Sequence, residues 1–155
     1  MNDITKKLAE LGHELPAAAA PAANYVPYVI SGDALYIAGQ IPFLNGEKMH
    51  MGRLGENLSL EDGVKAAQAC ALNILAQANA AVGGDWGTIK QLVKLGGFVN
   101  CVPEFYDHPK IVNGASDLMV DVMGDAGKHA RFAVGAPSLP LGVAVEIDAI
   151  FALNV

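Results

Sequence analysis

The spacing of apolar residues predicts a long helix that starts near Ser59. From there apolar positions recur every three or four residues, which is the pattern of a helix with one buried face. Ser59 is a favourable N-cap, and Glu61 and Asp62 complement the positive end of the helix dipole. Gly83-Gly84 then supplies a stop signal for this helix.

The same spacing predicts two further helices. One follows Pro109 and ends at Gly124. Its apolar face comprises Val112, Ala115, Leu118, Met119 and Val122. A shorter amphipathic helix is predicted over residues 2–15, and the Ala- and Pro-rich residues 16–23 that follow it form a linker.

Alternation with a period of two predicts β-strands. It is clearest in residues 143–153, where both alternating sets are mainly apolar, so this strand is expected to be covered on both faces. Shorter extended runs predict further strands at residues 25–30, 35–41, within 89–102 and at 131–134.

Glycines mark breaks in this pattern. Gly96-Gly97 interrupts the strand within residues 89–102 and indicates a bulge or a close backbone approach. Residues 42–58 are polar and contain glycines, so they are predicted to form a long loop.

The predicted order is hairpin, helix, strand, helix and two strands. This order indicates an α+β fold, a two-layer sandwich of one β-sheet with two helices packed on one face. The length of 155 residues fits one domain, 1–155. Within it we expect residues 1–21 to form the N-terminal helix and Ala/Pro linker, and residues 22–155 to form the core.

The low content of charged residues adds an expectation about the surface of the domain. Charged residues make up only 17% of the chain, against about 25% in typical soluble domains. A domain with so few charges is expected to bury part of its surface against copies of itself. The net charge is −6 and no run of Lys or Arg occurs, which weighs against nucleic-acid binding.

The remaining compositional features point to a cytoplasmic location. Cys70 and Cys101 are far apart in sequence and fit reduced, buried thiols. The sequence shows no signal-peptide pattern and no apolar run as long as a membrane span. We therefore expect a cytoplasmic protein that does not act at a membrane.

Arg131 and Glu146 are the charged residues of greatest interest, because each falls within a predicted apolar strand. The planar guanidinium of an arginine suits bidentate binding of a carboxylate. A carboxylate among apolar residues is unfavourable unless it is paired or hydrogen-bonded. Two interpretations stay open here. The residues form a structural pair or simply end in solvent, or they belong to a binding site.

Other chemistry has little support in the sequence. The histidines His13, His50, His108 and His129 lack the spacing of a metal site, and no glycine motif for nucleotides is present. Nothing indicates a serine nucleophile, and Cys101 is interpreted as a structural thiol. The prediction is therefore a protein without a metal or another cofactor.

The C-terminal motif resembles the signature of a known family. Arg131 is followed by Leu-Pro140 and then by Val-Glu146-Ile. This pattern is similar to the C-terminal signature of the Rid (reactive intermediate deaminase) family, also called the YjgF or endoribonuclease L-PSP family. The similarity spans about residues 22–154.

Three further elements support the resemblance. Tyr25-Val-Pro-Tyr28 is similar to the family's Gly-Pro-Tyr element. Ile-Ala38-Gly39-Gln-Ile-Pro is similar to its Ser-Gly-Gln-Ile/Leu-Pro element, with alanine in place of serine. Asn113 falls where the family has an asparagine in its second helix. The extra length at the N-terminus indicates a divergent, longer subgroup.

The resemblance implies a chorismate-mutase-like fold and a homotrimer with three clefts between subunits. In such clefts a 2-imino or 2-enamine acid is hydrolysed to a 2-keto acid and ammonia. Arg131 would hold the substrate carboxylate, and Glu146 would position the attacking water. The positions that would line the substrate are Tyr28, Ala38, Gly39, Asn113 and Ala133.

Three functions are therefore weighed. The first is hydrolytic deamination of imino or enamine acids. The second is a non-catalytic trimer that binds small carboxylate metabolites, such as keto acids, in the same cleft. The third is the endoribonuclease activity of the family's older name, and the acidic charge weighs against it.

Overall fold

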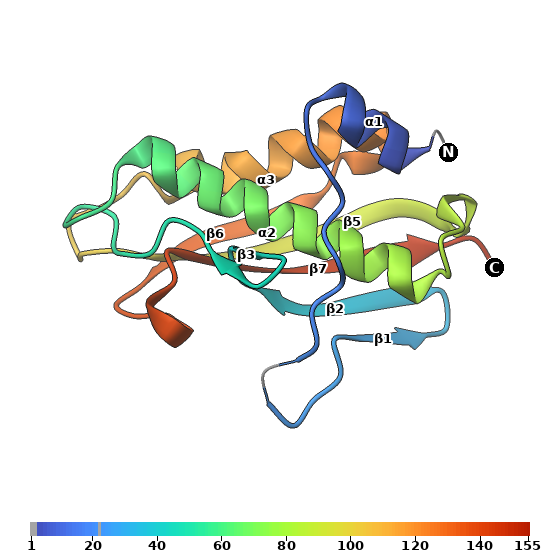
Figure 1. Ribbon diagram of the computed structural model, residues 1–155, viewed down its shortest axis with the longest axis horizontal. Helices are drawn as coiled ribbons and strands as arrows, with labels where there is room; N and C mark the ends of the chain where they lie inside the picture. The colour runs from blue at the N-terminus through green and yellow to red at the C-terminus, as the bar shows by residue number, and fades with distance from the viewer. Residues whose placement is uncertain (1–2, 22) are drawn as a thin grey trace.

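Five strands form one sheet in the order β1-β2-β7-β5-β6, as the computed structural model of residues 3–21 and 23–155 shows (Figure 1). Neighbouring strands are antiparallel except β5 and β6, which are parallel and joined through a helix. The strands are β1 (Tyr28–Ser31), β2 (Ala34–Gln40), β5 (Ile89–Asn100), β6 (Ala130–Ala136) and β7 (Val145–Leu153).

Two long helices, α2 (Leu60–Ala81) and α3 (His108–Met123), cover one face of this sheet (Figure 1). As predicted, the Ser59 hydroxyl accepts a hydrogen bond from the Asp62 amide at 3.1 Å and starts α2, and Gly124 ends α3. The predicted α+β class, with two helices on one face of a single sheet, is confirmed. Within the described residues, no helix combines the length and apolar character needed to cross a membrane.

The N-terminal helix α1 (Ile4–Glu10) packs on α3 with Ile4 and Leu8 fully buried. It is shorter than the predicted 2–15, because the chain turns at Gly12 with a φ of 81°. Residue 2 of that prediction lies outside the described residues. The following segment, residues 11–21 and 23–27, is called the linker below, and it descends across α2 towards the lower edge of the sheet (Figure 1).

The predicted loop at residues 42–58 contains a small hairpin instead. Strands β3 (Phe43–Leu44) and β4 (Glu47–Lys48) pair across Asn45 and Gly46, whose φ angles are 52° and 83°. Two consecutive left-handed residues are what a tight hairpin turn requires, and Asn-Gly is its commonest sequence. The predicted loop is wrong at this point, because the Asn45-Gly46 turn signal lies in a polar stretch that lacks the apolar alternation of longer strands. Single 3₁₀ turns occur at Trp86–Thr88, Gly124–Gly127 and Pro140–Gly142.

Gly96 and Gly97 allow close approach rather than a bulge. The register of β5 on β7 shifts earlier in the strand, before Gln91 and before Lys94. A Cβ at Gly96 would lie 2.7 Å from the Phe132 ring, and one at Gly97 would lie 2.7 Å from a Val112 methyl. Of the two predicted alternatives, the close approach is the correct one.

The two alternating sets of side chains in β7 lie on opposite faces of the sheet, as predicted, but within the described chain the helices cover only one of these faces. Val145, Ile147 and Ala149 are buried under the helices, whereas Glu146 and Asp148 point to the opposite side, called the open face below. The open face exposes apolar side chains from four strands. They are Val29, Tyr36, Phe98 and Val134.

The contact between α2 and α3 depends on Gly114, which is buried. A Cβ at this position would collide with the backbone oxygen of Val64 in α2. Because backbone cannot move aside as a side chain can, we expect Gly114→Ala to lower the free energy of unfolding by about 1–3 kcal/mol. Chemical denaturation measures this, with the exposed Asp117→Ala on the same helix as the control. An unchanged midpoint for Gly114→Ala would contradict the close helix contact.

Candidate functional site

Glu146 lies beside an irregularity in the neighbouring strand. Ile37 of β2 pairs with Ala149 of β7, but Gln40 pairs with Ile147, so three steps along β2 match two along β7. The extra residue places Gly39 against the glutamate. A Cβ on Gly39 would lie 2.6 Å from Oε1 of Glu146, so a side chain here would displace the carboxylate.

A cavity of about 590 Å³ opens at this point and is called the Glu146 cavity below. Gly39, Gln40 and Ile41 form its floor together with Glu146. The walls come from the linker, from α2 and from the turn after β6. The residues of these walls include Ala19, Ala20, Tyr25, Asn73, Gln77 and Leu141.

The Glu146 carboxylate is half-buried and has no hydrogen bond or ion pair to any residue of the described chain. Burial raises its pKa, and the nearby charge of Asp148 adds to this effect. A carboxyl group in a cavity with a raised pKa and no internal partner is typical of a site that handles protons or binds a ligand.

Arg131 belongs to a separate cluster on β6 and α3. Its guanidinium donates to the Ser116 hydroxyl at 3.1 Å and to the Pro109 carbonyl at 3.2 Å. His129 completes the cluster, with Nδ1 at 2.6 Å from the Gly127 carbonyl and Nε2 at 2.9 Å from the Ser116 oxygen. A carbonyl only accepts, so Nδ1 carries the proton, and in the neutral ring Nε2 accepts from Ser116.

This cluster fixes the direction of the arginine without neutralising it. No carboxylate in residues 3–21 and 23–155 forms an ion pair with Arg131, which is only partly buried. Two of its five N–H donors are used by the cluster, so the others are free for an anion.

Arg131 and Glu146 do not meet within one chain. Arg131 pairs with Leu95, and Leu95 pairs with Ala149, so the arginine lies on the helix face while Glu146 lies on the open face. The two are also two strands and three residues apart, or about 14 Å between Cα atoms by standard strand spacing. The interpretation of these residues as a structural pair is therefore wrong.

The other predicted site residues divide between the two locations. Ala133 follows Arg131 on the same side of β6, and Asn113 lies on α3 one turn from both Pro109 and Ser116. Ala38 and Gly39 lie at the irregularity beside Glu146. These four residues thus lie near Arg131 or near Glu146.

Tyr28 and Tyr25 differ in position. Tyr28 pairs with the buried Ile37 and packs against the core, whereas the exposed Tyr25 lines the Glu146 cavity. The resemblance implied Tyr28 as the tyrosine at the substrate, but Tyr28 is not among the residues that line this cavity.

Leu141 is a site feature that the sequence analysis did not find. It is 63% exposed, lines the Glu146 cavity and has a φ of 60°, which is unusual for a leucine. Such strain concentrates at functional sites. The only sequence signal is Gly142 directly after Pro140-Leu141, which is typical of a turn.

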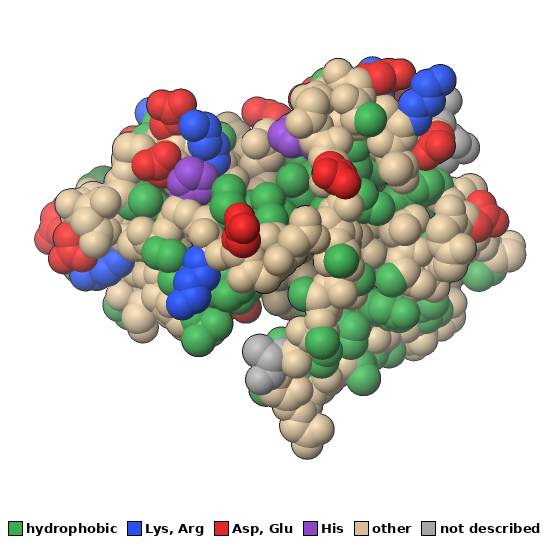
Figure 2. All heavy atoms as spheres, in the orientation of Figure 1, with side chains coloured by type: hydrophobic (Ala, Val, Ile, Leu, Met, Phe, Trp, Pro, Cys, Tyr) green, Lys and Arg blue, Asp and Glu red, His purple; other side chains and the backbone are tan. Residues whose placement is uncertain are grey.

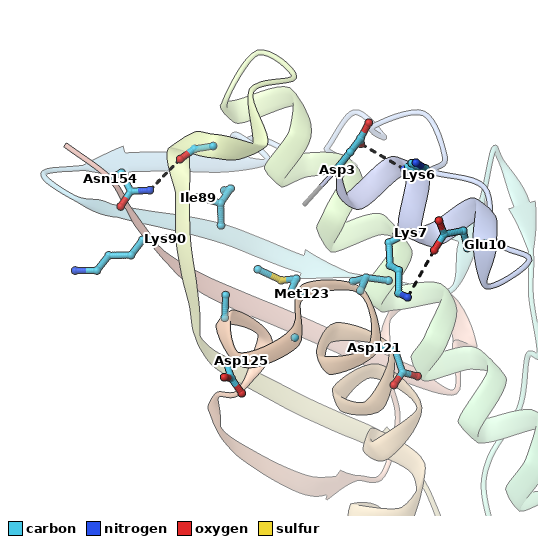
Figure 3. Close-up of a pocket in the computed structure, with 14 residues that line it drawn as sticks. Asp3, Lys6, Lys7, Glu10, Ile89, Lys90, Asp121, Met123, Asp125 and Asn154 are labelled. Atoms are coloured by element: carbon cyan, nitrogen blue, oxygen red, sulfur yellow. Dashed lines mark hydrogen bonds and ion pairs between the residues drawn. The ribbon is translucent and has the colours of Figure 1, made fainter. Parts of the chain in front are cut away.

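Two other cavities lie away from these residues. The larger, of about 870 Å³, lies between α1, the end of α3 and the start of β5 (Figure 3). Its charges are of mixed sign, and Lys7 is paired with Glu10 at 3.6 Å.

A third cavity of about 320 Å³ contains Cys101, whose Sγ lies 3.4 Å from His108 Nε2. Burial raises the pKa of the Cys101 thiol, which disfavours the reactive thiolate.

Metal binding has no visible basis in the described part of the chain. No three His, Cys, Asp or Glu side chains there are grouped closely enough to hold an ion. Both cysteines are free and buried, as predicted.

Comparison with known proteins agrees with this architecture. The model of the YjgF/chorismate mutase-like family, whose description also names an endoribonuclease, matches residues 5–152. Protein TCP17 of Trypanosoma cruzi is 47% identical over 152 residues, covering 97% of this chain and 94% of that protein.

Solved structures show the same relationship. Atu1372 from Agrobacterium tumefaciens, described as of unknown function, is 46% identical with a TM-score of 0.93, covering 99% of this chain and 94% of that one. TdcF of E. coli, solved with bound serine, is 25% identical with a TM-score of 0.60, covering 90% of this chain and 93% of that one.

The fold and the family match together define the class as α+β proteins of the chorismate mutase-like type. The chain belongs to the YjgF/Rid family, as its C-terminal motif predicted.

The raised pKa of Glu146 has a consequence for stability. Because folding raises this pKa, the native state binds the proton more tightly than the unfolded chain does, so ionisation of Glu146 destabilises the fold. That destabilisation is absent below the unfolded pKa and grows as the pH rises through the folded one.

We therefore expect Glu146→Gln to be as stable as the wild type near pH ~4 and more stable, by no more than about 1 kcal/mol, near pH ~7. Urea denaturation across this range measures the difference. Glu104→Gln is the matched control, because Glu104 is exposed and forms no ion pair or side-chain hydrogen bond within the described residues. A difference that shrank as the pH rose would contradict the raised pKa.

Proposed function

We propose that the protein hydrolyses 2-imino or 2-enamine acids to 2-keto acids and ammonia, in a site shared by two subunits. The observation that carries this proposal is the unpaired Glu146 carboxylate in its cavity, together with an Arg131 that is oriented by neighbours yet lacks an anionic partner among the described residues. One group suits proton transfer, and the other suits carboxylate binding.

The chemistry needs only these two groups and water. Arg131 binds the substrate carboxylate and places the C=N carbon next to Glu146. Glu146 accepts a proton from the water that attacks the protonated C=N group as the C–O bond forms, and it returns that proton to the nitrogen of the resulting carbinolamine. As the C–N bond then breaks, Glu146 takes the remaining hydroxyl proton and passes it to water. The products are the keto acid and ammonia. A carboxyl group with a raised pKa is well suited to accept and return a proton near neutral pH.

Assembly between subunits follows from the separation of the two groups. Since they occupy opposite faces of one sheet, a single chain cannot present both to one small molecule. The exposed apolar side chains of the open face offer a surface for further copies. Figure 2 shows charged side chains mainly around the helices and the two ends, whereas the lower part of the view, where the linker and β1 lie, is mainly uncharged.

The relative TdcF supports carboxylate binding, since it was solved with serine, an amino acid. Binding alone is the alternative function, and it would need Arg131 but not Glu146. Ribonuclease activity has less support, because the net charge of −6 opposes RNA binding. We accordingly propose a homotrimer without a cofactor, as the family resemblance implies.

The shared site can be tested by mixing two inactive variants. Arg131→Ala is expected to lower kcat/KM for 2-iminopropanoate by a factor equivalent to about 2–5 kcal/mol, because the substrate carboxylate loses its partner. Glu146→Gln is expected to lower kcat. In randomly mixed trimers about one quarter of the clefts would combine an intact Arg131 with an intact Glu146 from another subunit.

We therefore expect co-refolded Arg131→Ala and Glu146→Gln chains to recover about a quarter of the wild-type rate of imine loss. Each variant refolded alone is the control and stays inactive. Absence of recovery in well-folded mixed trimers would contradict a site shared between subunits. Unchanged activity of Glu146→Gln would contradict its role in proton transfer.

The assembly surface gives a separate prediction. Tyr36 lies on the open face and is 47% exposed. Tyr36→Glu places a charge on the proposed interface and is expected to convert the oligomer to monomer, as measured by light scattering, with an unchanged far-ultraviolet circular dichroism spectrum. Tyr106→Glu, which replaces a 78% exposed tyrosine away from the sheet, is the control. An intact oligomer for Tyr36→Glu would exclude this face as the interface.

A further inference from the structure

The walls of the Glu146 cavity are apolar, and one wall comes from outside the sheet and helices. The linker contributes Ala19, Ala20, Pro21 and Ala23, which line the same cavity as Glu146. Ile41, Phe43 and Leu141 add apolar surface elsewhere.

The polar groups in these walls are largely occupied. Both N–H groups of the Asn73 amide are used, at 2.9 Å from the Ile41 carbonyl and 2.6 Å from the Phe43 carbonyl. The Gln77 amide donates to the Ala19 carbonyl at 2.7 Å, and the Gln40 amide donates to the Ala38 carbonyl at 2.9 Å. The described lining contains no Lys, Arg or His, so Glu146 is the only charged residue there.

Two hydrogen bonds hold the linker in place beside the cavity. The bond from Gln77 ties Ala19 to α2, and the Ala17 amide donates to the Asn45 side chain in the β3–β4 turn at 3.1 Å. Gln77 is 2% exposed, so its link to the linker is shielded from water. The linker is therefore held in place next to the cavity by groups that have no part in the reaction.

We infer that the protein selects substrates with a branched aliphatic or aromatic side chain, which packs against the linker. This inference rests on the proposed function, since it places the reacting carbon beside Glu146. A volume of about 590 Å³ is more than a three-carbon imino acid fills. An apolar side chain would pack on the apolar surface that this chain contributes, whereas an acidic one would meet no cation in this chain's described lining and would be repelled by Glu146.

Three imines, produced in place by amino-acid oxidases, test this selectivity. They derive from alanine, leucine and aspartate, and the last two have side chains with equal numbers of non-hydrogen atoms. We expect kcat/KM for the leucine-derived imine to exceed that for the alanine-derived one by roughly 10- to 50-fold, through the burial of three more carbon atoms. The aspartate-derived imine is expected to be the slowest of the three.

A pair of variants then assigns the selectivity to the linker. Ala20→Phe fills part of the cavity and is expected to lower the leucine-to-alanine ratio of kcat/KM by roughly 10-fold. Ala18→Phe is the matched control, because Ala18 is an exposed alanine of the same segment outside the cavity lining, and it should keep the wild-type ratio. A ratio lowered equally by both variants, or a change of oligomeric state with Ala20→Phe alone, would overturn the role of the linker.

The outcomes separate this inference from the proposed function. If the wild type accelerates hydrolysis of the alanine-derived imine as much as that of the leucine-derived one, deamination stands and the inference fails. If no imine is accelerated, deamination fails, and calorimetric titration with 2-oxo-4-methylpentanoate and with pyruvate decides the inference. Tighter binding of 2-oxo-4-methylpentanoate than of pyruvate would support the inference, provided that Ala20→Phe weakens this binding and Ala18→Phe does not. Equal affinities for the two keto acids would overturn the inference.

Discussion

The contact between Gly39 and Glu146 is the constraint on which the candidate site depends. A glutamate in the central strand of a sheet would normally be crowded by the neighbouring strand, and here the missing side chain of Gly39 leaves room for it. The extra residue in β2 also ends regular pairing, so the cavity opens at the same point. Access to the carboxyl group therefore depends on this irregularity, whereas its raised pKa results from burial and, to a lesser extent, from the charge of Asp148.

The two halves of the site are stabilised by different means. Arg131 is held by a chain of hydrogen bonds that runs through Ser116 to His129 and its backbone acceptor. Glu146 is held by packing alone, without a hydrogen-bond partner in the described residues. A fixed cation and an unpaired carboxylate are complementary to a substrate that carries a carboxylate next to an electrophilic carbon. Their separation within one chain makes the proposed chemistry depend on subunit association.

Much of this architecture could be predicted from the sequence, because it depends on local patterns. The apolar spacing after Ser59 and the alternation around Glu146 identified α2, the two faces of β7 and the fold class. The sequence could not show that Arg131 and Glu146 lie on opposite faces, since facing depends on the register of three paired strands. It also could not show the linker beside Glu146, because that contact depends on the distant side chain of Gln77.

The position of the linker outside the packed helices and strands has a consequence for the evolution of the cavity. Most cavity walls in enzymes belong to the core, where substitutions that alter the ligand also disturb folding. Here Ala20 and Ala23 are exposed residues outside every helix and strand, so replacing them alters the cavity while leaving the packed layers intact. In the proposed site, ligand preference and thermodynamic stability would thereby be carried by separate parts of one small chain.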